Sequence, residues 1–317
     1  MSDPEATTRP ALPYKTTLNW LDKLRLGAAC AVAAAIFWSV GWIAADLTDP
    51  LGGVSLTNRD TPWVGWLELV GLAAITAPIA VAIAGAVLPD AGAFAVAFGL
   101  AVLSMRSGQV SDLQRYAEGS AGEFYLPLGV EMAGWLVAMV VAMLAGGWVE
   151  AWFLPEPPGE SDEPSPRDPR PAKAVRPVVS LGMAAATGSS RPRGELSTGA
   201  ISAAVSVLAG WGLIWLLGNP SDHWILKGQV LFSVSAAMFV AALFSHQIFQ
   251  CRLNLWFVLA VGILGLLGYG LAAAGSPSAL SRMLPLEYIS AGTAGAVAGT
   301  WFSQRVVESK LEAPAKG

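Results

Sequence analysis

The chain has 317 residues, of which 54% are hydrophobic and 13% are charged, with a mean hydropathy of +0.53 and a formal net charge of −4 at pH 7. Soluble domains carry about 25% charged residues, so this composition excludes a soluble domain as the bulk of the chain. The small net charge gives no reason to expect a nucleic-acid partner. Several apolar stretches of about 20 residues instead predict helices that span a membrane.

A polar N-terminal tail, residues 1–25, precedes the first apolar stretch, and a charged tail, residues 304–317, ends the chain. The eight candidate spans between them are 26–45, 63–88, 91–105, 126–148, 197–217, 228–249, 255–274 and 286–302. The stretch 91–105 is short: at about 1.5 Å per residue it barely crosses a hydrocarbon core of about 30 Å. It therefore fits either a short span or a re-entrant hairpin.

The Lys and Arg residues discriminate between eight spans and seven. With eight spans, 14 of them lie on the side that holds both termini and the segment between the fourth and fifth spans, and 5 lie on the other side. Without a crossing at 91–105 the split becomes 8 and 11, which is almost no bias. Basic residues concentrate on the cytoplasmic side of membrane proteins. The sequence therefore predicts an all-α polytopic protein of eight transmembrane helices in the cell membrane, with both termini cytoplasmic.

Residues 150–196 separate the spans into two sets, 26–149 and 197–303. This segment is rich in Pro, Ser and charged residues, a composition that predicts a disordered cytoplasmic linker. Its basic part, RDPRPAKAVRPVV, could contact anionic lipid, and its Pro spacing could suit a groove-binding partner. A plain connector is the favoured interpretation.

The two sets of spans share residues at matching positions. The fourth span opens LPLGVEMAGWLVA (126–138) and the eighth opens LPLEYISAGTAGA (284–296), with six of thirteen positions identical. The first and fifth spans each end in two Trp residues four apart. The order of these matches predicts two related four-helix units. Because each unit has an even number of spans, both would have the same orientation, related by a pseudo-twofold axis along the membrane normal.

Two carboxylates inside the spans are the candidate binding residues. Glu68 and Glu131 each lie five residues inside the outer end of a span, where a charge costs free energy unless it faces the bundle or water. Arg106 and Arg115 of an outer loop are possible partners, and the duplication places Gln229 opposite Glu68. One interpretation is an outward-facing cation or proton site. The favoured one is a structural hydrogen bond.

Small residues line the seventh and eighth spans. Glycines three or four apart allow two helix backbones to approach closely. We therefore predict helix packing at Gly262, Gly265, Gly268, Gly292, Gly295 and Gly299. The pattern leaves open whether these contacts lie within the bundle or between protomers.

The sequence carries no catalytic, metal or cofactor signature: HExxH, GxSxG, GxxxxGK[ST], CxxC and a Gly-rich dinucleotide turn are all absent. His246 could relay protons or bind haem, but His223 is predicted on the opposite side of the membrane. A solvated, interfacial histidine is the favoured interpretation. We therefore expect no enzyme activity, no cofactor and no metal.

Two functional hypotheses remain. The first is a structural or accessory membrane protein, or an assembly subunit, whose partners are the lipid bilayer and other membrane proteins or a second copy of itself. The alternative is a small transporter or channel with an outward-facing acidic site, containing Glu68 and Glu131, between the two units.

Overall fold

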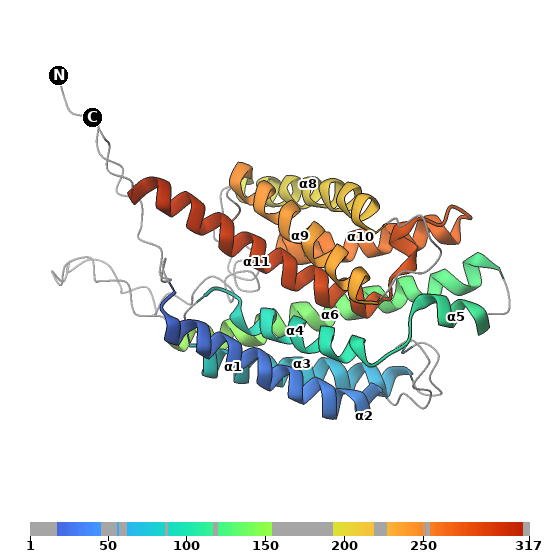
Figure 1. The fold of residues 1–317 in the computed structure, drawn as a ribbon, viewed down its shortest axis with the longest axis horizontal. Coiled ribbons are helices and arrows are strands. Elements are labelled where there is room, and N and C mark those ends of the chain that lie inside the picture. Colours follow the sequence, from blue (N-terminus) through green and yellow to red (C-terminus); the bar gives the residue numbers. More distant parts are fainter. Residues whose placement is uncertain are drawn as a thin grey trace, which may run out of the picture.

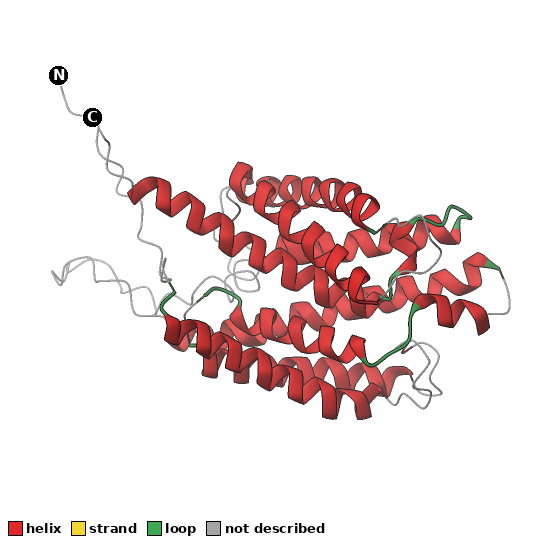
Figure 2. Ribbon diagram, viewed as in Figure 1, coloured by secondary structure: helices red, strands yellow, loops and turns green. Residues whose placement is uncertain are grey.

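The computed structural model describes residues 18–45, 56, 62–85, 88–116, 120–153, 193–218, 227–249, 251 and 254–312. Every regular element in these ranges is helical (Figure 2). The elements are α1 (Trp20–Ile36), the π-helix η1 (Phe37–Gly41), α2 (Trp42–Ala45), α3 (Pro62–Ala84), α4 (Ala91–Met105), α5 (Val110–Tyr116), α6 (Ala121–Phe153), α8 (Arg193–Leu217), α9 (Lys227–Phe249), α10 (Leu255–Ala273), the 3-10 helix η3 (Ala279–Arg282) and α11 (Pro285–Glu312).

Six of these helical segments are long and apolar enough to cross a membrane. They are Trp20–Ala45, Trp63–Ala84, Ala121–Glu150, Leu196–Leu217, Lys227–Phe249 and Leu255–Ala273. The chain is therefore a multi-pass helical membrane protein. Helices also lie at the other two predicted positions, but α4 is short at 15 residues and α11 is less apolar. Their crossing of the membrane stays a prediction.

The low hydropathy of α11 has a structural reason. From Pro285 to Trp301 none of its residues is exposed, and the buried polar side chains among them are Glu287, Ser290, Thr293 and Thr300. A helix that contacts other helices rather than lipid tails does not need an apolar surface. Burial thus allows the small and polar residues that weaken its transmembrane signature.

The helices form two groups, shown on either side of the molecule in Figure 1. In the first half, α1 packs on α3 and α4, and α6 packs on α3 and α4. In the second half, α8 packs on α9 and α10, and α11 packs on α9 and α10. The halves meet where α4 contacts α11, where α6 contacts α10, and where α6 contacts α11.

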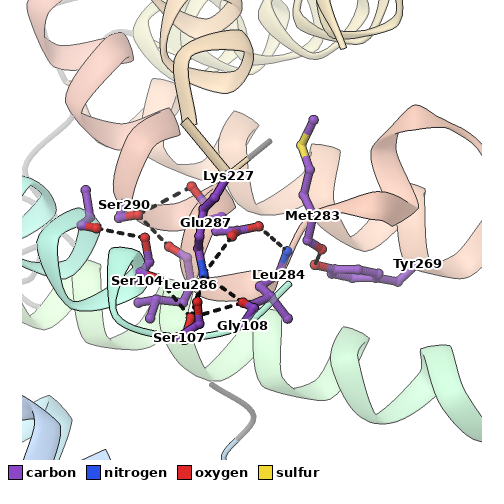
Figure 3. Close-up of polar contacts among 11 residues, drawn as sticks. Ser104, Ser107, Gly108, Lys227, Tyr269, Met283, Leu284, Leu286, Glu287 and Ser290 are labelled. Carbon is purple, nitrogen blue, oxygen red and sulfur yellow. Dashed lines mark hydrogen bonds and ion pairs between the residues drawn. The ribbon is translucent and has the colours of Figure 1, made fainter. Parts of the chain in front are cut away.

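The bundle has two ends that the following sections distinguish. The Pro89 end holds the turn between α3 and α4, the start of α1 and the C-terminal part of α11 (Figure 1). There Leu88, Val297 and Trp301 form one buried cluster, with Leu18, Leu26 and Phe94 packed against it. The Lys227 end is the opposite one, where α4 ends and where α9 and α11 begin (Figure 3).

Backbone contact joins α9 to α11. A Cβ atom on Gly295 would lie 2.1 Å from the Ser235 carbonyl oxygen, and one on Gly299 would lie 2.3 Å from that of Phe239. Both distances are far inside van der Waals contact, so these positions accept no side chain without separating the helices. Within α10, Gly262 and Gly265 face Leu136 and Met132 of α6, Gly268 faces Leu280, and in α11 Gly292 faces Val261. The structure thus places all six predicted glycines at helix contacts inside the bundle.

Several helices begin before their apolar stretches, because polar side chains cap them. The tail was expected to reach residue 25, yet α1 begins at Trp20: Asn19 Oδ1 accepts the Asp22 amide at 2.8 Å and the Asp22 carboxylate accepts the Asn19 amide at 3.2 Å. In the same way Ser120 and Glu123 exchange hydrogen bonds of 3.0 and 3.4 Å at the start of α6. Apolarity locates the lipid-facing part of a helix, whereas capping sets where it starts.

Other predicted boundaries also shift. The second span was expected to reach residue 88, but α3 ends at Ala84, because Gly85 has a left-handed φ of 69°. The loop after α4 contains the short helix α5. The expected linker, 150–196, loses both edges to α6 and α8, and the rest of it lies outside the described residues.

Candidate functional site

At the Lys227 end the two halves meet around one ammonium group (Figure 3). Lys227 Nζ donates to the Ser107 carbonyl at 2.6 Å, the Ser107 hydroxyl at 2.7 Å and the Gly108 carbonyl at 2.7 Å. A carboxylate oxygen of Glu287 lies 3.3 Å from the same nitrogen. Exposed fractions of 14% for the Lys227 side chain and 2% for that of Glu287 place the group inside the protein. Because Ser107 and Gly108 follow α4 while Lys227 and Glu287 belong to α9 and α11, the ammonium bridges the halves.

The end of α4 supplies the carbonyl groups. The Ser107 amide and hydroxyl both donate to the Ser104 carbonyl, at 3.1 and 2.8 Å, which turns the chain just after the helix. Ser107 and Gly108 lie just beyond Met105, the last residue of α4, where the C-terminal end of the helix dipole carries partial negative charge and attracts a cation. Lys227, the first residue of α9, provides that cation.

The start of α11 supplies the carboxylate. Pro285 occupies the first helical position, where its missing amide hydrogen costs nothing. Glu287 then accepts the Leu284 amide hydrogen at 2.8 Å through Oε2, an arrangement that resembles one half of a capping box. Its other oxygen, Oε1, faces Lys227. A single side chain therefore fixes both the helix start and the ion pair.

Two buried tyrosines lie beside the ion pair. The hydroxyls of Tyr269 and Tyr288 donate to backbone carbonyls of the segment 280–283 at 2.6 and 2.7 Å, and their rings meet edge to face with centroids 6.1 Å apart. Tyr269 also lies within electrostatic range of Glu131 and Glu287. The buried polar groups of α6, α10 and α11 thus share one region between the halves.

Glu131, one of the two predicted site carboxylates, lies in this region with an exposed fraction of 0%. It accepts the Leu56 amide hydrogen at 3.1 Å and the Trp135 indole hydrogen at 3.2 Å. Leu56 belongs to the connection between α2 and α3, and its side chain is fully buried. Glu131 therefore anchors a connecting segment in the bundle.

The remaining predicted site residues do not gather around Glu131. Glu68 is exposed on α3, and Gln229 is half-buried in the first turn of α9. The expected pairing of Arg106 with a glutamate is not what the structure shows. Its Nη1 donates to the Trp38 carbonyl at 2.6 Å, and its guanidinium lies 4.5 and 4.0 Å from the ring centroids of Trp38 and Trp42. Aromatic rings of η1 and α2 contact the cation instead. The side chain of Arg115 lies outside the described residues.

At the Pro89 end a second polar cluster holds the turn between α3 and α4. The Glu150 carboxylate accepts the Asp90 and Ala91 amide hydrogens at 3.4 and 3.2 Å, and so caps α4 from α6. The Asn254 amide donates to the Asp90 carboxylate at 2.6 Å, and the Trp301 indole donates to the Pro89 carbonyl at 2.8 Å. Side chains of α6, α11 and the N-cap of α10 therefore converge on three residues of this turn.

No protein-family model, no curated protein and no solved structure matches this chain. The interpretation of its polar clusters therefore depends on their geometry alone.

Sequence reasoning missed Lys227, Glu287, Glu150, Asn254 and Asp90. One local signal was available: Glu287 stands two residues after a proline at a predicted span start, the pattern of a capped helix. The other pairings join residues 60 to 164 positions apart, and no periodic pattern encodes them.

His246 also differs from its predicted environment. It is 7% exposed rather than solvated, and its Nδ1 lies 2.9 Å from the Ser303 hydroxyl of α11. Its ring packs near that of Phe257, with centroids 6.3 Å apart. Among the described residues no group of three or more His, Cys, Asp or Glu side chains is arranged to hold a metal ion. His246 thus joins α9 to α11 as part of the packing.

Proposed function

We propose that this chain is a structural or accessory membrane protein, or an assembly subunit, without enzyme activity of its own. The observation that carries the proposal is the use of its buried carboxylates. Glu131, Glu150 and Glu287 each accept a backbone amide hydrogen from a connection or a helix start. A buried charge used in this way stabilises one arrangement of the chain. The acidic groups thus serve the fold.

An exposed carboxylate supports the existence of a membrane partner. Glu68 lies exposed on α3, beside Trp63 and Leu67, which are 80% and 75% exposed. A charge on the surface of a membrane-spanning helix costs free energy unless water or another protein solvates it. A neighbouring helix that offers a cation or hydrogen-bond donors would lower that cost. We therefore place the partner surface on this part of α3.

The proposal includes eight spans arranged as two four-helix units of the same orientation. The packing of the helices supports it: the pairs α1–α3, α1–α4, α3–α6 and α4–α6 have counterparts in α8–α9, α8–α10, α9–α11 and α10–α11, although among the described residues no comparable α9–α10 contact matches α3–α4. The cross-contacts α4–α11 and α6–α10 exchange equivalent helices. The N-cap residues of α4 and α10, Asp90 and Asn254, also contact each other. Exchanged contacts between equivalent helices, and a contact between equivalent N-caps, are the features expected of a pseudo-twofold axis.

The proposed membrane is the cell membrane, with the termini and the linker cytoplasmic. The split of 14 basic residues against 5 supports this orientation. Protease added to sealed right-side-out vesicles should leave residues 154–192 intact, and should cut there once the vesicles are opened. Cleavage in sealed vesicles would refute the orientation.

The accessory function is tested by the state of the chain in mild detergent extracts of its native membrane. We expect wild-type chain in a discrete complex larger than the monomer. Glu68→Leu should release it from that complex without lowering its melting temperature, because Glu68 is exposed in the monomer. Leu208→Ala on α8, an exposed position on another helix, is the control that should stay in the complex. A wild-type monomer, or a Glu68→Leu variant that keeps its partner, would contradict the proposal.

A small transporter or channel is the second candidate. It is favoured by the ion pair of Lys227 and Glu287, which lies with Glu131 at the boundary between the halves, where membrane transporters place coupling sites. In this version Glu68 is not part of the path. Ion or proton flux into proteoliposomes that Glu287→Gln abolishes, while the protein still folds, would favour transport over the accessory function. Equal leakage with and without the protein would exclude it.

A further inference from the structure

The oxygen atoms around Lys227 Nζ have the composition of a cation site. Two backbone carbonyls, one hydroxyl and one carboxylate surround a single positive charge (Figure 3). Such groups, especially carbonyls at the ends of membrane helices, replace the hydration shell of monovalent cations. We propose that the oxygens of Ser107, Gly108 and Glu287 form a monovalent-cation site, and that the ammonium of Lys227 is its tethered occupant, which a free cation can replace.

The distances distinguish this site from a simple ion pair. The ammonium nitrogen lies 2.6–2.7 Å from the three neutral oxygens of Ser107 and Gly108, but 3.3 Å from the Glu287 carboxylate. Among these oxygen atoms the Glu287 carboxylate is therefore not the one nearest to the ammonium. Here the cation is centred on the carbonyl and hydroxyl oxygens, and the carboxylate neutralises its charge from slightly farther away.

An empty site would be unfavourable. Without the ammonium, the Ser107 and Gly108 carbonyls would lose their donor, and Glu287 would lose its counter-charge at 2% exposure. The guanidinium of Arg106 lies nearby in sequence but is stacked on Trp38 and Trp42. The 14% exposure of the Lys227 side chain indicates that solvent reaches the edge of the site. A cation from solution is therefore the natural replacement.

Occupancy would also connect the two halves. Ser107 and Gly108 extend from α4, whereas Glu287 belongs to α11, so a cation bound by all three residues holds α4 to α11 at the Lys227 end. This inference does not depend on the accessory function. It requires only that the binding of a small cation to the site is favourable.

Chemical rescue tests the site in the purified full-length chain. Lys227→Ala removes three methylene groups and the ammonium, which n-propylammonium replaces almost atom for atom. We expect the variant to melt at a lower temperature, and n-propylammonium chloride to restore roughly half of the loss or more in a saturable way. Tetramethylammonium chloride at the same ionic strength is the size control, because its charge cannot approach the oxygens closely. Equal effects of the two salts would overturn the proposal.

A neutral double variant makes the test independent of how well Lys227→Ala folds. Lys227→Met combined with Glu287→Gln removes both charges while keeping similar volumes, so it should fold without an added cation and show no shift specific to n-propylammonium. If Lys227→Ala is recovered from membranes only when n-propylammonium is present during extraction, the site is supported. The proposal would be overturned if Lys227→Ala could not be recovered with either salt while the double variant was recovered. It would also be overturned if n-propylammonium raised the melting temperatures of the two variants equally.

Discussion

The two ends of the bundle join the two halves of the protein through different chemical groups. At each end the two halves must be joined where helices terminate and leave backbone groups unpaired. At the Lys227 end a cation satisfies the carbonyls after α4. At the Pro89 end an anion, Glu150, satisfies the amide hydrogens at the start of the same helix. Both choices follow the direction of the peptide dipoles in α4.

The ends differ in how far their charges are compensated. Lys227 meets a carboxylate of opposite sign, so removing either residue isolates a buried charge. Glu150 accepts backbone amide hydrogens, and the neighbouring Asp90 accepts a hydrogen bond from the Asn254 side chain. The Lys227 end should therefore respond to changes of charge, and the Pro89 end to changes of hydrogen bonding.

The largest expected effect is that of Lys227→Met. It leaves Glu287 buried without its cation, which should lower the free energy of unfolding by about 3–5 kcal/mol. Denaturant titration in detergent, followed by tryptophan fluorescence, measures it. The double variant Lys227→Met with Glu287→Gln should recover much of the loss, and a double variant no more stable than the single one would show that charge is not what matters at this end.

At the Pro89 end, Glu150→Ala should cost about 2–3 kcal/mol, because the amides of Asp90 and Ala91 lose their acceptor. Glu150→Gln keeps one of the two acceptor oxygens and places an NH2 donor at the other, so it should cost less than Glu150→Ala but still destabilise in the same titration. A Glu150→Ala variant as stable as wild type would show that these hydrogen bonds do not stabilise the start of α4.

The positions of the helices could be predicted from the sequence, because a lipid-facing helix needs a continuous apolar stretch. Within the described residues a helix lies at each of the eight predicted positions, although α4 is short, and the predicted glycines lie at helix contacts. Six of these helices are long and apolar enough to cross a membrane, and the predicted crossing of α4 and α11 stays a prediction. α11 is surrounded by protein from Pro285 to Trp301, so its composition reports its neighbours rather than the membrane.

The polar clusters could not be predicted for a related reason. Glu68 and Glu131 are equally deep in their spans by sequence, yet one is exposed and the other is fully buried. Depth follows from position along a helix, whereas burial depends on which face the neighbouring helices cover. Lys227 was passed over because it stands at a span end, where lysines normally reach water. Its partners Ser107 and Gly108 lie about 120 positions earlier in the chain, and Glu287 belongs to a later helix.

The next effect concerns Asn254→Asp and depends on pH. Burial raises the pKa of Asp90, and the Asn254 hydrogen bond partly opposes this rise. A carboxyl whose pKa is higher in the folded state binds its proton more tightly there, so its contribution is full below the unfolded value of about 3.9 and is lost as pH rises through the folded pKa. A second carboxylate at position 254 should strengthen this trend.

We therefore expect Asn254→Asp to be nearly as stable as wild type at acidic pH and to lose about 2 kcal/mol as pH rises towards neutrality, because two neighbouring buried carboxylates resist ionising together. Melting temperatures across that range measure the difference. Asn254→Ala, which removes the donor without adding a charge, should show a weaker dependence on pH. Identical pH profiles for the two variants would mean that Asp90 is not the titrating group.

The smallest expected effect comes from Arg106, the half-buried cation at the Lys227 end. Its guanidinium stacks on Trp38 and Trp42 and donates to the Trp38 carbonyl beside the π-helix η1. Because no buried carboxylate in the described part of the chain is paired with this cation, Arg106→Ala should lower the free energy of unfolding by only about 0.5–1 kcal/mol. Arg106→Lys keeps the charge but not the planar stacking, so its stability should lie between those of wild type and Arg106→Ala. If Arg106→Ala lowered the free energy of unfolding as much as Lys227→Met does, the burial of a cation would not determine its contribution to stability. The total charge at this end, rather than the site around Lys227, would then hold the two halves together.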